Sequence, residues 1–298
     1  MILISGASGL IGSALVRTLR SGNREVKRLV RRPVSRADEV SWYPDRGEID
    51  PRAMEGVTAV VNLAGENLSQ RWTTGARRRI RDSRIEATTL LARTMAKSHA
   101  KPRVLVSASA MGIYGTHRDH PIDESAELGD DFLASVCKEW ESAAKPASDA
   151  GARVAFSRTG LVLARDGGLL AKMLLPFRLG LGGRLGGGRQ WMSWIALTDV
   201  VGALRFMIEN EAVAGPVNVV APNPVTNAEF TDTLGRVLGR PTFTMVPEFA
   251  LKLALGQMAE DTALASQRVI PRRLQESGFQ FELPTLEVAL RHELSRSA

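Results

Sequence analysis

Residues 2–12 read ILISGASGLIG, a short apolar segment that runs into three glycines placed at every third position. The apolar and partly β-branched segment Ile2–Ser5 predicts a buried strand. From Leu10 to Leu19, apolar side chains recur at helical spacing, which predicts a helix. A strand that passes through a glycine loop into a helix is typical of the first βα unit of dinucleotide-binding folds.

Each glycine of this loop has a separate structural role. The first permits a sharp turn, the second lets a pyrophosphate approach the backbone, and the third allows the helix to pack closely on the strand. The free N–H groups at the start of the helix then face the phosphates. A glycine triplet alone also fits a plain tight turn, but its place at the first junction of a βαβ series favours a dinucleotide. We therefore expect cofactor contacts from Gly6, Ser8, Gly9, Leu10, Ile11 and Gly12.

Strands and helices continue to alternate along the chain. Further strands are expected at residues 25–30, 57–63, 104–109 and 153–163, with long helices at 77–98 and from 131 onward. The segment 57–63, VTAVVNL, is rich in β-branched apolar residues, as a strand buried on both faces should be. Alternation at this spacing predicts βαβ units. The fold class is therefore α/β, a Rossmann-like doubly wound parallel sheet.

The character of the chain changes after residue 165. Residues 167–191 are rich in glycine and have no clean period, which indicates a loop-helix-loop excursion from the sheet. We predict a Rossmann domain over 1–165 and a smaller, interleaved C-terminal substrate lobe over 166–298. Within that lobe, residues 196–220 are expected to return to the Rossmann sheet as a helix and a strand.

Two helices of this second part begin with capping signals. Thr198 or Asp199 is expected near the N-cap of a helix that extends to Ile208. Thr226 is followed three residues later by Glu229, the spacing of a capping box. Both signals predict that helices start at these points.

The overall composition excludes several classes of protein. With 298 residues, 44% of them hydrophobic and 24% charged, the chain is an ordinary globular one. The single cysteine allows no disulfide framework within the chain, and the four histidines lack metal-ligand spacing, so no metal site is expected. The N-terminus is not a signal peptide, and no stretch of about 18 apolar residues occurs. We expect a cytoplasmic protein without a membrane partner.

The net charge of +7 raises the question of nucleic-acid binding. The arginines are scattered over helices that also carry Asp and Glu, and no aromatic-basic motif of an RNA-binding sheet occurs. Solvated basic helix faces are the better explanation, so no nucleic-acid partner is expected. Part of the excess charge could serve an anionic small molecule.

The end of the second strand indicates which dinucleotide is bound. Binders of NAD place an acidic residue there, where it holds the ribose 2′-hydroxyl. The sequence KRLVRRP at 27–33 places Arg31 and Arg32 at that point instead. Paired guanidinium groups suit a 2′-phosphate, either by bidentate hydrogen bonds or by stacking on the adenine. NADP(H) is therefore the predicted cofactor, the alternative being two solvated surface arginines.

Further motifs support a family resemblance. They are GASGLIG (6–12), VVNLAGEN (60–67), SASAMGIYG (107–115) and WIALTDVVGAL (194–204). On these motifs the chain resembles the extended short-chain dehydrogenase/reductase superfamily, in its nucleotide-sugar epimerase branch. Matches along the full length further resemble an uncharacterised epimerase-family subgroup that carries a C-terminal domain of unknown function. Some members of that subgroup have been labelled cell-division inhibitors.

The resemblance implies additional cofactor contacts. Leu63, Ala64, Gly65, Glu66 and Arg71 lie at or after the end of the fourth strand. Ser107 lies on the strand at 104–109, and Gly160 and Leu161 follow the sixth strand. In the family, a tyrosine four residues before a lysine performs the chemistry, because the lysine lowers the pKa of the phenol. Here DDFLASVCKEWE (130–141) contains Lys138 but no tyrosine. The tyrosine position falls on Ala134, or on Leu133 if Glu141 sets the register.

Only two tyrosines exist in the chain, Tyr43 and Tyr114. Tyr43 is expected to be structural. Tyr114 lies just past a strand end, where it either replaces the missing acid or packs and binds substrate. Ser109 is one place away from the position of the family's serine. Ser107 and Ser109 are each either a polar group near the nicotinamide or a satisfied hydroxyl at the strand end. The catalytic candidates are therefore Tyr114, Ser109 and Lys138.

Two functions remain open at this point. The first is an NADP(H)-dependent oxidoreductase or epimerase that acts on an unknown small molecule, with acid-base help from Tyr114, a serine or water. The second is a non-catalytic NADP(H)-binding sensor or partner-binding protein that has lost the Tyr-Lys pair. The resemblance also implies a homodimer in which the long helices from Arg77 and from Asp131 pair.

Overall fold

The computed structural model describes residues 1–99 and 102–295, which form two compact units. The first unit comprises residues 1–110, 136–158 and 201–217, and the second comprises 111–135, 159–200 and 218–298. The sequence placed one boundary at 165 and a smaller second lobe, whereas the two units are of similar size. The reason is that β7 (Arg118–Ile122) and β9 (Leu161–Ala164) pair with strands of the second unit, β16 (Gln267–Val269) and β12 (Trp194–Ala196).

An eight-stranded sheet organises the first unit. Its order is β13-β8-β6-β5-β1-β2-β3-β4. These strands are β1 Ile2–Ser5, β2 Val26–Val30, β3 Glu39–Tyr43, β4 Glu48–Ile49, β5 Ala59–Asn62, β6 Val104–Ala110, β8 Arg153–Thr159 and β13 Gly215–Val219. Strands β3, β2, β1, β5 and β6 pair in parallel, and β4 is antiparallel to β3. Strands β1 and β5 are buried throughout, as parallel strands covered on both faces must be.

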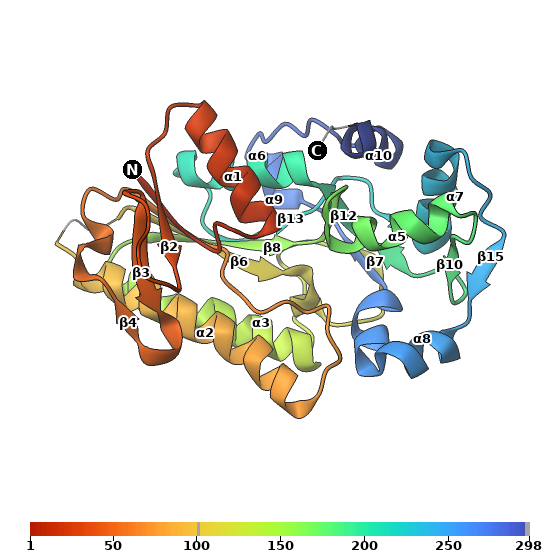
Figure 1. The fold of residues 1–298 in the computed structure, drawn as a ribbon, viewed down its shortest axis with the longest axis horizontal. Coiled ribbons are helices and arrows are strands. Elements are labelled where there is room, and N and C mark those ends of the chain that lie inside the picture. The colour runs from red at the N-terminus through yellow and green to blue at the C-terminus, as the bar shows by residue number, and fades with distance from the viewer. Residues whose placement is uncertain (100–101, 296–298) are drawn as a thin grey trace. The chain divides into compact units, whose positions relative to one another are not determined.

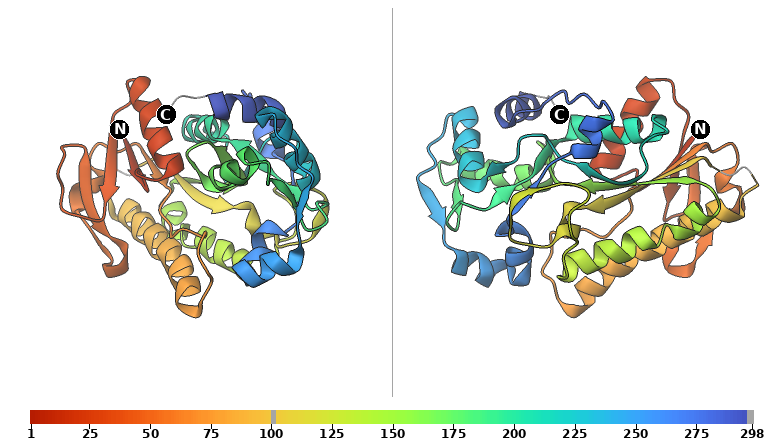
Figure 2. Two further views of the ribbon diagram at one scale, coloured as in Figure 1. Left: turned by 45° about the vertical axis from the view of Figure 1, so that its right-hand side comes forward. Right: turned by 180° about the vertical axis from the view of Figure 1, so that it is seen from behind.

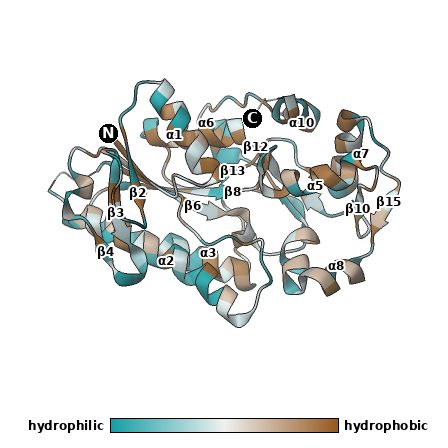
Figure 3. Cartoon of the chain, viewed as in Figure 1, coloured by the Kyte–Doolittle hydropathy of each residue, from teal (hydrophilic) through white to brown (hydrophobic). Residues whose placement is uncertain are grey.

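Helices cover both faces of this sheet. They are α1 Leu10–Ser21, α2 Thr74–Lys97, α3 Phe132–Ser142, α4 Lys145–Asp149 and α6 Leu197–Glu209. Figures 1 and 2 show α1 and α6 on one face of the sheet and α2 and α3 on the other. The ribbon of α1 in Figure 3 alternates between hydrophobic and hydrophilic residues, because only the face with Leu15 and Leu19 is buried. The predicted doubly wound α/β fold is therefore confirmed.

The second unit combines short two-stranded sheets with helices. Its other strands are β10 Gly183–Leu185, β11 Trp191–Met192, β14 Val225–Thr226 and β15 Thr244–Val246. Its helices are α5 Gly168–Arg178, α7 Asn227–Leu238, α8 Glu248–Leu255, α9 Arg272–Glu276 and α10 Leu286–Ser295. A core of its own includes Leu170, Phe177, Trp194 and Phe230, all of which are buried. Among the described helices, none is long and apolar enough to cross a membrane.

Three local predictions can be compared with the structure. The capping box is present, because the Thr226 hydroxyl accepts from the N–H of Glu229 and the Glu229 carboxylate accepts from the N–H of Thr226. The single strand at 153–163 is instead broken at Gly160. There the N–H of Gly160 bonds to Val219, whereas the next N–H bonds to Ser193. Helix α6 begins at Leu197, so Thr198 and Asp199 lie within its first turn, and the carboxylate of Asp199 accepts from the N–H groups of residues 282 and 283.

Candidate functional site

In the glycine loop between β1 and α1, Gly6 and Gly12 have no space for a side chain. Gly6 has a φ of +66°, and a Cβ built on it would lie 2.5 Å from the carbonyl oxygen of Leu63. A Cβ on Gly12 would lie 2.2 Å from the carbonyl oxygen of Gly6. Gly9 caps α1 without a side-chain hydrogen bond. The first N–H groups of α1, at Leu10 and Ile11, therefore remain available to an anion.

A buried hydrogen-bond network supports this loop from below. The Ser5 hydroxyl donates to Asn62 Oδ1 at 2.6 Å, and Asn62 Nδ2 donates to Thr88 Oγ1 at 2.7 Å. The same Thr88 oxygen accepts from the indole N–H of Trp140 at 2.9 Å. The N–H of Leu63 donates to the Ser5 hydroxyl, which ties the chain after β5 to the end of β1. The network fixes the two strand ends on either side of the glycine loop.

A cleft of about 1090 Å³ opens above the loop, within the first unit. Of the predicted cofactor residues, its lining includes Gly6, Ser8, Gly9, Arg31, Arg32, Leu63, Ala64, Gly65 and Glu66. The volume is at the upper end of the roughly 300–1,000 Å³ that is usual for small-molecule sites. Helix α2 contributes the opposite wall through Arg79 and Ser83. The cleft thus joins the glycine loop, the end of β2 and the segment after β5.

Seven predicted contacts lie outside this lining, namely Leu10, Ile11 and Gly12 at the start of α1, and Arg71, Ser107, Gly160 and Leu161. Ser107 is fully buried and its hydroxyl donates to the carbonyl of the next residue. Arg71 is exposed in the loop before α2. Gly160 and Leu161 belong to the second unit.

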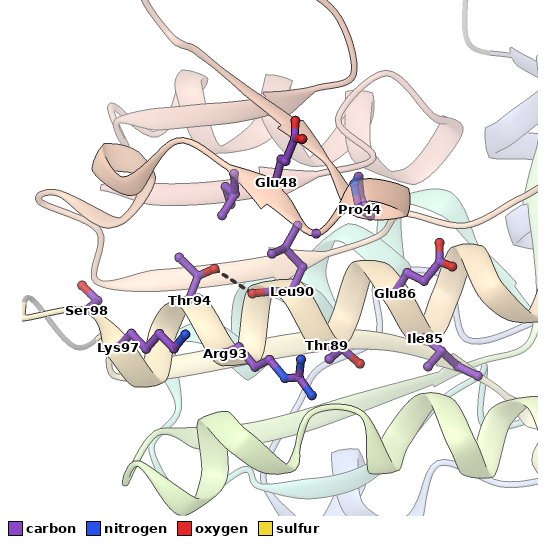
Figure 4. Close-up of a pocket in the computed structure, with 12 residues that line it drawn as sticks. Pro44, Glu48, Ile85, Glu86, Thr89, Leu90, Arg93, Thr94, Lys97 and Ser98 are labelled. Atoms are coloured by element: carbon purple, nitrogen blue, oxygen red, sulfur yellow. Dashed lines mark hydrogen bonds between the residues drawn. The ribbon is translucent and has the colours of Figure 1, made fainter.

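A second hollow of about 710 Å³ lies in the first unit, between α2 and the residues around β4 (Figure 4). The C-terminal half of α2 supplies most of its lining, including Ile85, Leu90 and Arg93, and Pro44 and Glu48 face them. The C-terminal end of a helix carries partial negative charge, which disfavours phosphate. The cleft at the glycine loop is therefore the better dinucleotide site.

The two arginines after β2 have different surroundings. Arg32 forms a bidentate ion pair with Glu39, with nitrogen–oxygen distances of 2.7 and 2.9 Å. The hydrogen bonds of Arg32 and of the Ser35 N–H lower the pKa of Glu39 to about 2. Arg31 is exposed at the cleft and, within the described part of the chain, pairs with no side chain. Arg31 therefore presents to the cleft a guanidinium group that no carboxylate in the described part of the chain offsets.

The end of β6 carries a second polar arrangement in the same unit. The Ser109 hydroxyl donates to Glu141 Oε1 at 2.7 Å. Arg158, on β8, donates to both oxygens of that carboxylate at 2.9 Å. Ser109 lies two residues past Ser107, which is paired with Asn62 at the carboxyl end of β5. Ser109 therefore lies beyond the carboxyl end of β5, where the chain after β5 begins, and it is held there by Glu141 and, through that carboxylate, by Arg158.

Comparison with known proteins identifies the family. Residues 2–221 match the NAD dependent epimerase/dehydratase family, and residues 246–293 match a domain of unknown function, DUF1731. The chain belongs to the NAD-dependent epimerase/dehydratase family. The resemblance to extended short-chain dehydrogenases/reductases is thereby confirmed.

The similar proteins extend this epimerase-family assignment over the whole chain. An epimerase family protein of Mycobacterium leprae is 46% identical over 99% of this chain and 96% of its own length. The Arabidopsis thaliana chloroplastic homolog of SDR39U1 is 40% identical over 97% of this chain and 85% of its own. The crystal structure of human epimerase family protein SDR39U1 (isoform 2) with NADPH has a TM-score of 0.90, with 35% identity and 99% coverage of both chains. MoeE5 in complex with UDP-glucuronic acid and NAD, at 21% identity and a TM-score of 0.78, covers 97% of this chain and 96% of its own and supports the fold.

This epimerase-family protein has no phenol at either candidate tyrosine position. Ala134 is fully buried. In the other register, the lysine position is taken by Cys137, and burial raises the pKa of its thiol to about 12. Lys138 is half-buried as a residue, and its ammonium group bonds to none of the residues that the structure describes. Neither candidate position on α3 therefore holds a tyrosine.

Tyr114 belongs to the second unit of the epimerase-family chain and is fully buried. Its hydroxyl donates to Asn218 Oδ1 at 2.7 Å, and the amide of Asn218 donates to the carbonyl of Ile270 at 3.0 Å. Because the Tyr114 hydroxyl already donates a hydrogen bond to the buried amide oxygen of Asn218, Tyr114 has the environment of a packing residue. This geometry favours the second of the two interpretations of Tyr114.

Sequence reasoning missed two residues of this arrangement. Glu141 entered only as a marker of register, and Arg158 did not enter at all. Two signals were available in the sequence. Glu141 is an acid at the end of an amphipathic helix, and Arg158 is an arginine within an apolar strand. Because charged residues are seldom buried without a partner, these two could have been expected to pair. No group of three or more His, Cys, Asp or Glu side chains in the described ranges is arranged to hold a metal ion.

Proposed function

We propose that this protein binds NADP(H) in the cleft above the glycine loop and acts on a small molecule as an oxidoreductase or epimerase. The observation that carries the proposal is the combination of free N–H groups at the start of α1 with an uncompensated Arg31. The first suits a pyrophosphate, and the second suits a 2′-phosphate. The NADPH in the structure of human SDR39U1, at 35% identity, supports the same cofactor.

The residues present fit such a cofactor. The glycine loop lets the diphosphate approach the backbone, and the residues after β5 form the adjoining wall of the cleft. When bound, the nicotinamide supplies a hydride donor or acceptor. The protein must then orient a substrate carbon and handle the proton on the neighbouring oxygen.

Ser109 is the candidate group for orienting that oxygen. The Ser109 hydroxyl donates its hydrogen bond to Glu141, so its oxygen lone pairs are left to accept a hydrogen bond from a substrate hydroxyl. Arg158 neutralises the carboxylate and fixes its orientation through two hydrogen bonds. With the oxidised nicotinamide taking the hydride, the proton of a substrate alcohol would pass to Ser109 as Ser109 passes its own proton to Glu141. The arrangement therefore suits an alcohol substrate better than a carbonyl that needs a donated proton.

A second candidate function is a non-catalytic NADP(H)-binding sensor or partner-binding protein. The specific observation in its favour is that neither tyrosine position on α3 holds a phenol and that the Tyr114 hydroxyl bonds to Asn218. A protein of this kind would bind the cofactor tightly without turning over any alcohol or carbonyl.

The two functions are separated by a turnover assay. Purified protein is tested with NADP⁺ and a panel of alcohols, and with NADPH and a panel of carbonyls, following absorbance of the reduced nicotinamide. Catalysis through Ser109 predicts that Ser109→Ala lowers kcat by roughly tenfold or more while the cofactor Kd stays within about twofold. Ser142→Ala, at the exposed C-terminal end of α3, is the matched serine-to-alanine control and should leave kcat unchanged.

The remaining outcomes are also informative. Tyr114→Phe should leave kcat unchanged, because the hydroxyl is buried against Asn218. No turnover with either panel, together with tight NADPH binding, would support the sensor. No binding of any nicotinamide dinucleotide by folded protein would reject both functions.

A further inference from the structure

Large apolar side chains that face solvent gather in two stretches of the second unit, residues 172–189 and 240–253. Among the described residues ten large hydrophobic side chains are exposed, and seven of them lie in these stretches. The seven are Leu175, Leu179, Leu181, Phe243, Met245, Phe249 and Leu253. Exposed apolar side chains that gather in this way mark a surface that contacts a partner or a membrane.

The fold brings the two stretches together. Strand β10 pairs in parallel with β15, and the two lie side by side in Figure 1. The Thr244 hydroxyl lies 3.1 and 2.9 Å from the carbonyl oxygens of Leu181 and Gly182. Helix α8 begins directly after β15, and a Cβ built on Gly186 would lie 2.7 Å from Cγ of Glu248, the first residue of that helix. Residues 172–189 and 240–253 therefore form one surface, which we call the apolar-basic surface.

Helical periodicity gives this surface two exposed apolar stripes. Leu175 and Leu179 are four residues apart at the C-terminal end of α5, and Phe249 and Leu253 are four residues apart on α8. Residues at this spacing lie one above the other on the same face of a helix. Each helix therefore presents apolar atoms to solvent as well as to the core.

The largest of these side chains protrude instead of lining a groove. Phe243 is 95% exposed and Leu253 is 83% exposed, so both make little contact with their own chain. A pocket for a ligand or a peptide would cover its apolar lining in part. Apolar side chains that protrude singly are better suited to insertion into the boundary between lipid headgroups and acyl chains.

The same surface is strongly basic. Six basic residues against one acidic residue give the two stretches a net charge of +5, which is most of the +7 of the whole chain. The basic residues are Lys172, Arg178, Arg184, Arg189, Arg240 and Lys252, all of them exposed. Arg184 pairs with Asp232 and Lys252 pairs with Glu260. The other four form no ion pair with any residue that the structure describes, so their charge is available to an anionic partner.

This charge decides between the possible occupants. A second copy of the chain would place a like charge against the surface, which is unfavourable. An anionic lipid surface supplies both the opposite charge and an apolar phase. The expectation from the sequence that the protein has no membrane partner rested on the lack of a spanning stretch, and peripheral binding requires none.

We propose that the apolar-basic surface binds peripherally to membranes that contain anionic phospholipids. Phe243, Phe249 and Leu253 enter the boundary between headgroups and acyl chains, and the four unpaired cations contact the lipid phosphates. None of the residues of this surface lines the cofactor cleft, so the proposal does not depend on which dinucleotide binds.

Cosedimentation of the full chain with vesicles tests the proposal. The vesicles contain phosphatidylcholine alone or an equal mixture of phosphatidylcholine and phosphatidylglycerol. The unaltered protein should bind the mixture and not phosphatidylcholine alone, and added salt should weaken the binding because it screens exposed charges.

Two double variants separate the apolar and the electrostatic contributions. Phe249→Gln with Leu253→Gln should lower the partition coefficient by roughly tenfold or more, since two apolar side chains no longer leave water. Lys172→Gln with Arg178→Gln should lower it by about twentyfold, because one basic residue near an anionic surface contributes roughly a factor of five. All four positions are exposed, so urea midpoints should stay close to that of the unaltered protein.

Each double variant has a matched control. Val288→Gln changes an exposed apolar residue on α10, outside the surface, and Arg36→Gln with Lys97→Gln removes two exposed charges from the first unit. Both controls should bind vesicles as the unaltered protein does. The proposal is overturned if the unaltered protein does not bind the mixed vesicles, if it binds phosphatidylcholine alone equally well, or if the controls lose binding to the same extent. A dimer in analytical ultracentrifugation that Phe249→Gln with Leu253→Gln abolishes would also overturn it, because a second copy would then cover this surface.

Discussion

Replacing Arg158 by methionine should destabilise the first unit far more than the loss of an ordinary surface ion pair. The Arg158 side chain is 5% exposed and that of Glu141 is 13% exposed. The substitution removes two hydrogen bonds of 2.9 Å and leaves the carboxylate with Ser109 as its remaining side-chain donor among those described above. Removing one partner from a buried pair typically costs about 3–5 kcal/mol. We expect a loss within that range.

The assay is urea unfolding followed by circular dichroism and tryptophan fluorescence. Lys145→Met provides the control, because Lys145 pairs with Asp149 on α4 with side chains that are 73% and 59% exposed. An exposed pair of this kind contributes about 0–1 kcal/mol. The difference between the two variants therefore isolates the effect of burial.

A double variant separates the ion pair from simple packing. Arg158→Met combined with Glu141→Leu removes both charges and fills the space with apolar atoms. Stability should recover most of the loss, because replacing a buried pair by apolar residues is often neutral. If Arg158→Met is no worse than Lys145→Met, or if the double variant is no better than the single one, the buried carboxylate is not the cause.

Three further predictions concern the cleft and its surroundings. Gly6→Ala should abolish NADPH binding in calorimetry while the far-ultraviolet spectrum is retained, because the new Cβ would lie 2.5 Å from the Leu63 carbonyl oxygen. Cys137 should react with iodoacetamide at pH 8 only after denaturation, since burial raises its pKa to about 12; rapid labelling of native protein would contradict this. The pKa of Glu39 falls from 4.5 to about 2 on folding, so its contribution to stability is present above about pH 4.5 and is lost as the pH falls toward 2. Urea midpoints measured over that interval should depend less on pH in Glu39→Gln; an unchanged slope would speak against the ion pair.

Much of the fold follows from local patterns in the sequence. The glycine spacing after β1, the apolar strand β5 and the capping box at Thr226 are each encoded within a few residues, and all three occur in the structure. The break at Gly160 could not be predicted in this way. It arises because consecutive N–H groups find acceptors on Val219 and Ser193, which lie far along the chain.

In the candidate site too, some features are encoded by local sequence and others depend on contacts between distant residues. The glycine loop and Arg31 could be found from the sequence, because their roles depend on position relative to one strand. The engagement of Arg32 by Glu39 depends on the pairing of β2 with β3, which places Arg28 opposite Glu39. Similarly, the contact of Ser109 with Glu141 joins residues 32 positions apart. Neither pairing leaves a periodic signal in the sequence.

The hydroxyl of Thr88 has a consequence for how this protein tolerates mutation. It accepts from Asn62 and Trp140 and donates to the carbonyl of Arg84, so all of its bonding capacity is used. An isosteric change to valine would leave an amide and an indole without an acceptor, directly beneath the strand ends that frame the dinucleotide cleft. A screen for lost cofactor affinity should therefore recover substitutions of Thr88, although its own side chain is not part of the cleft lining.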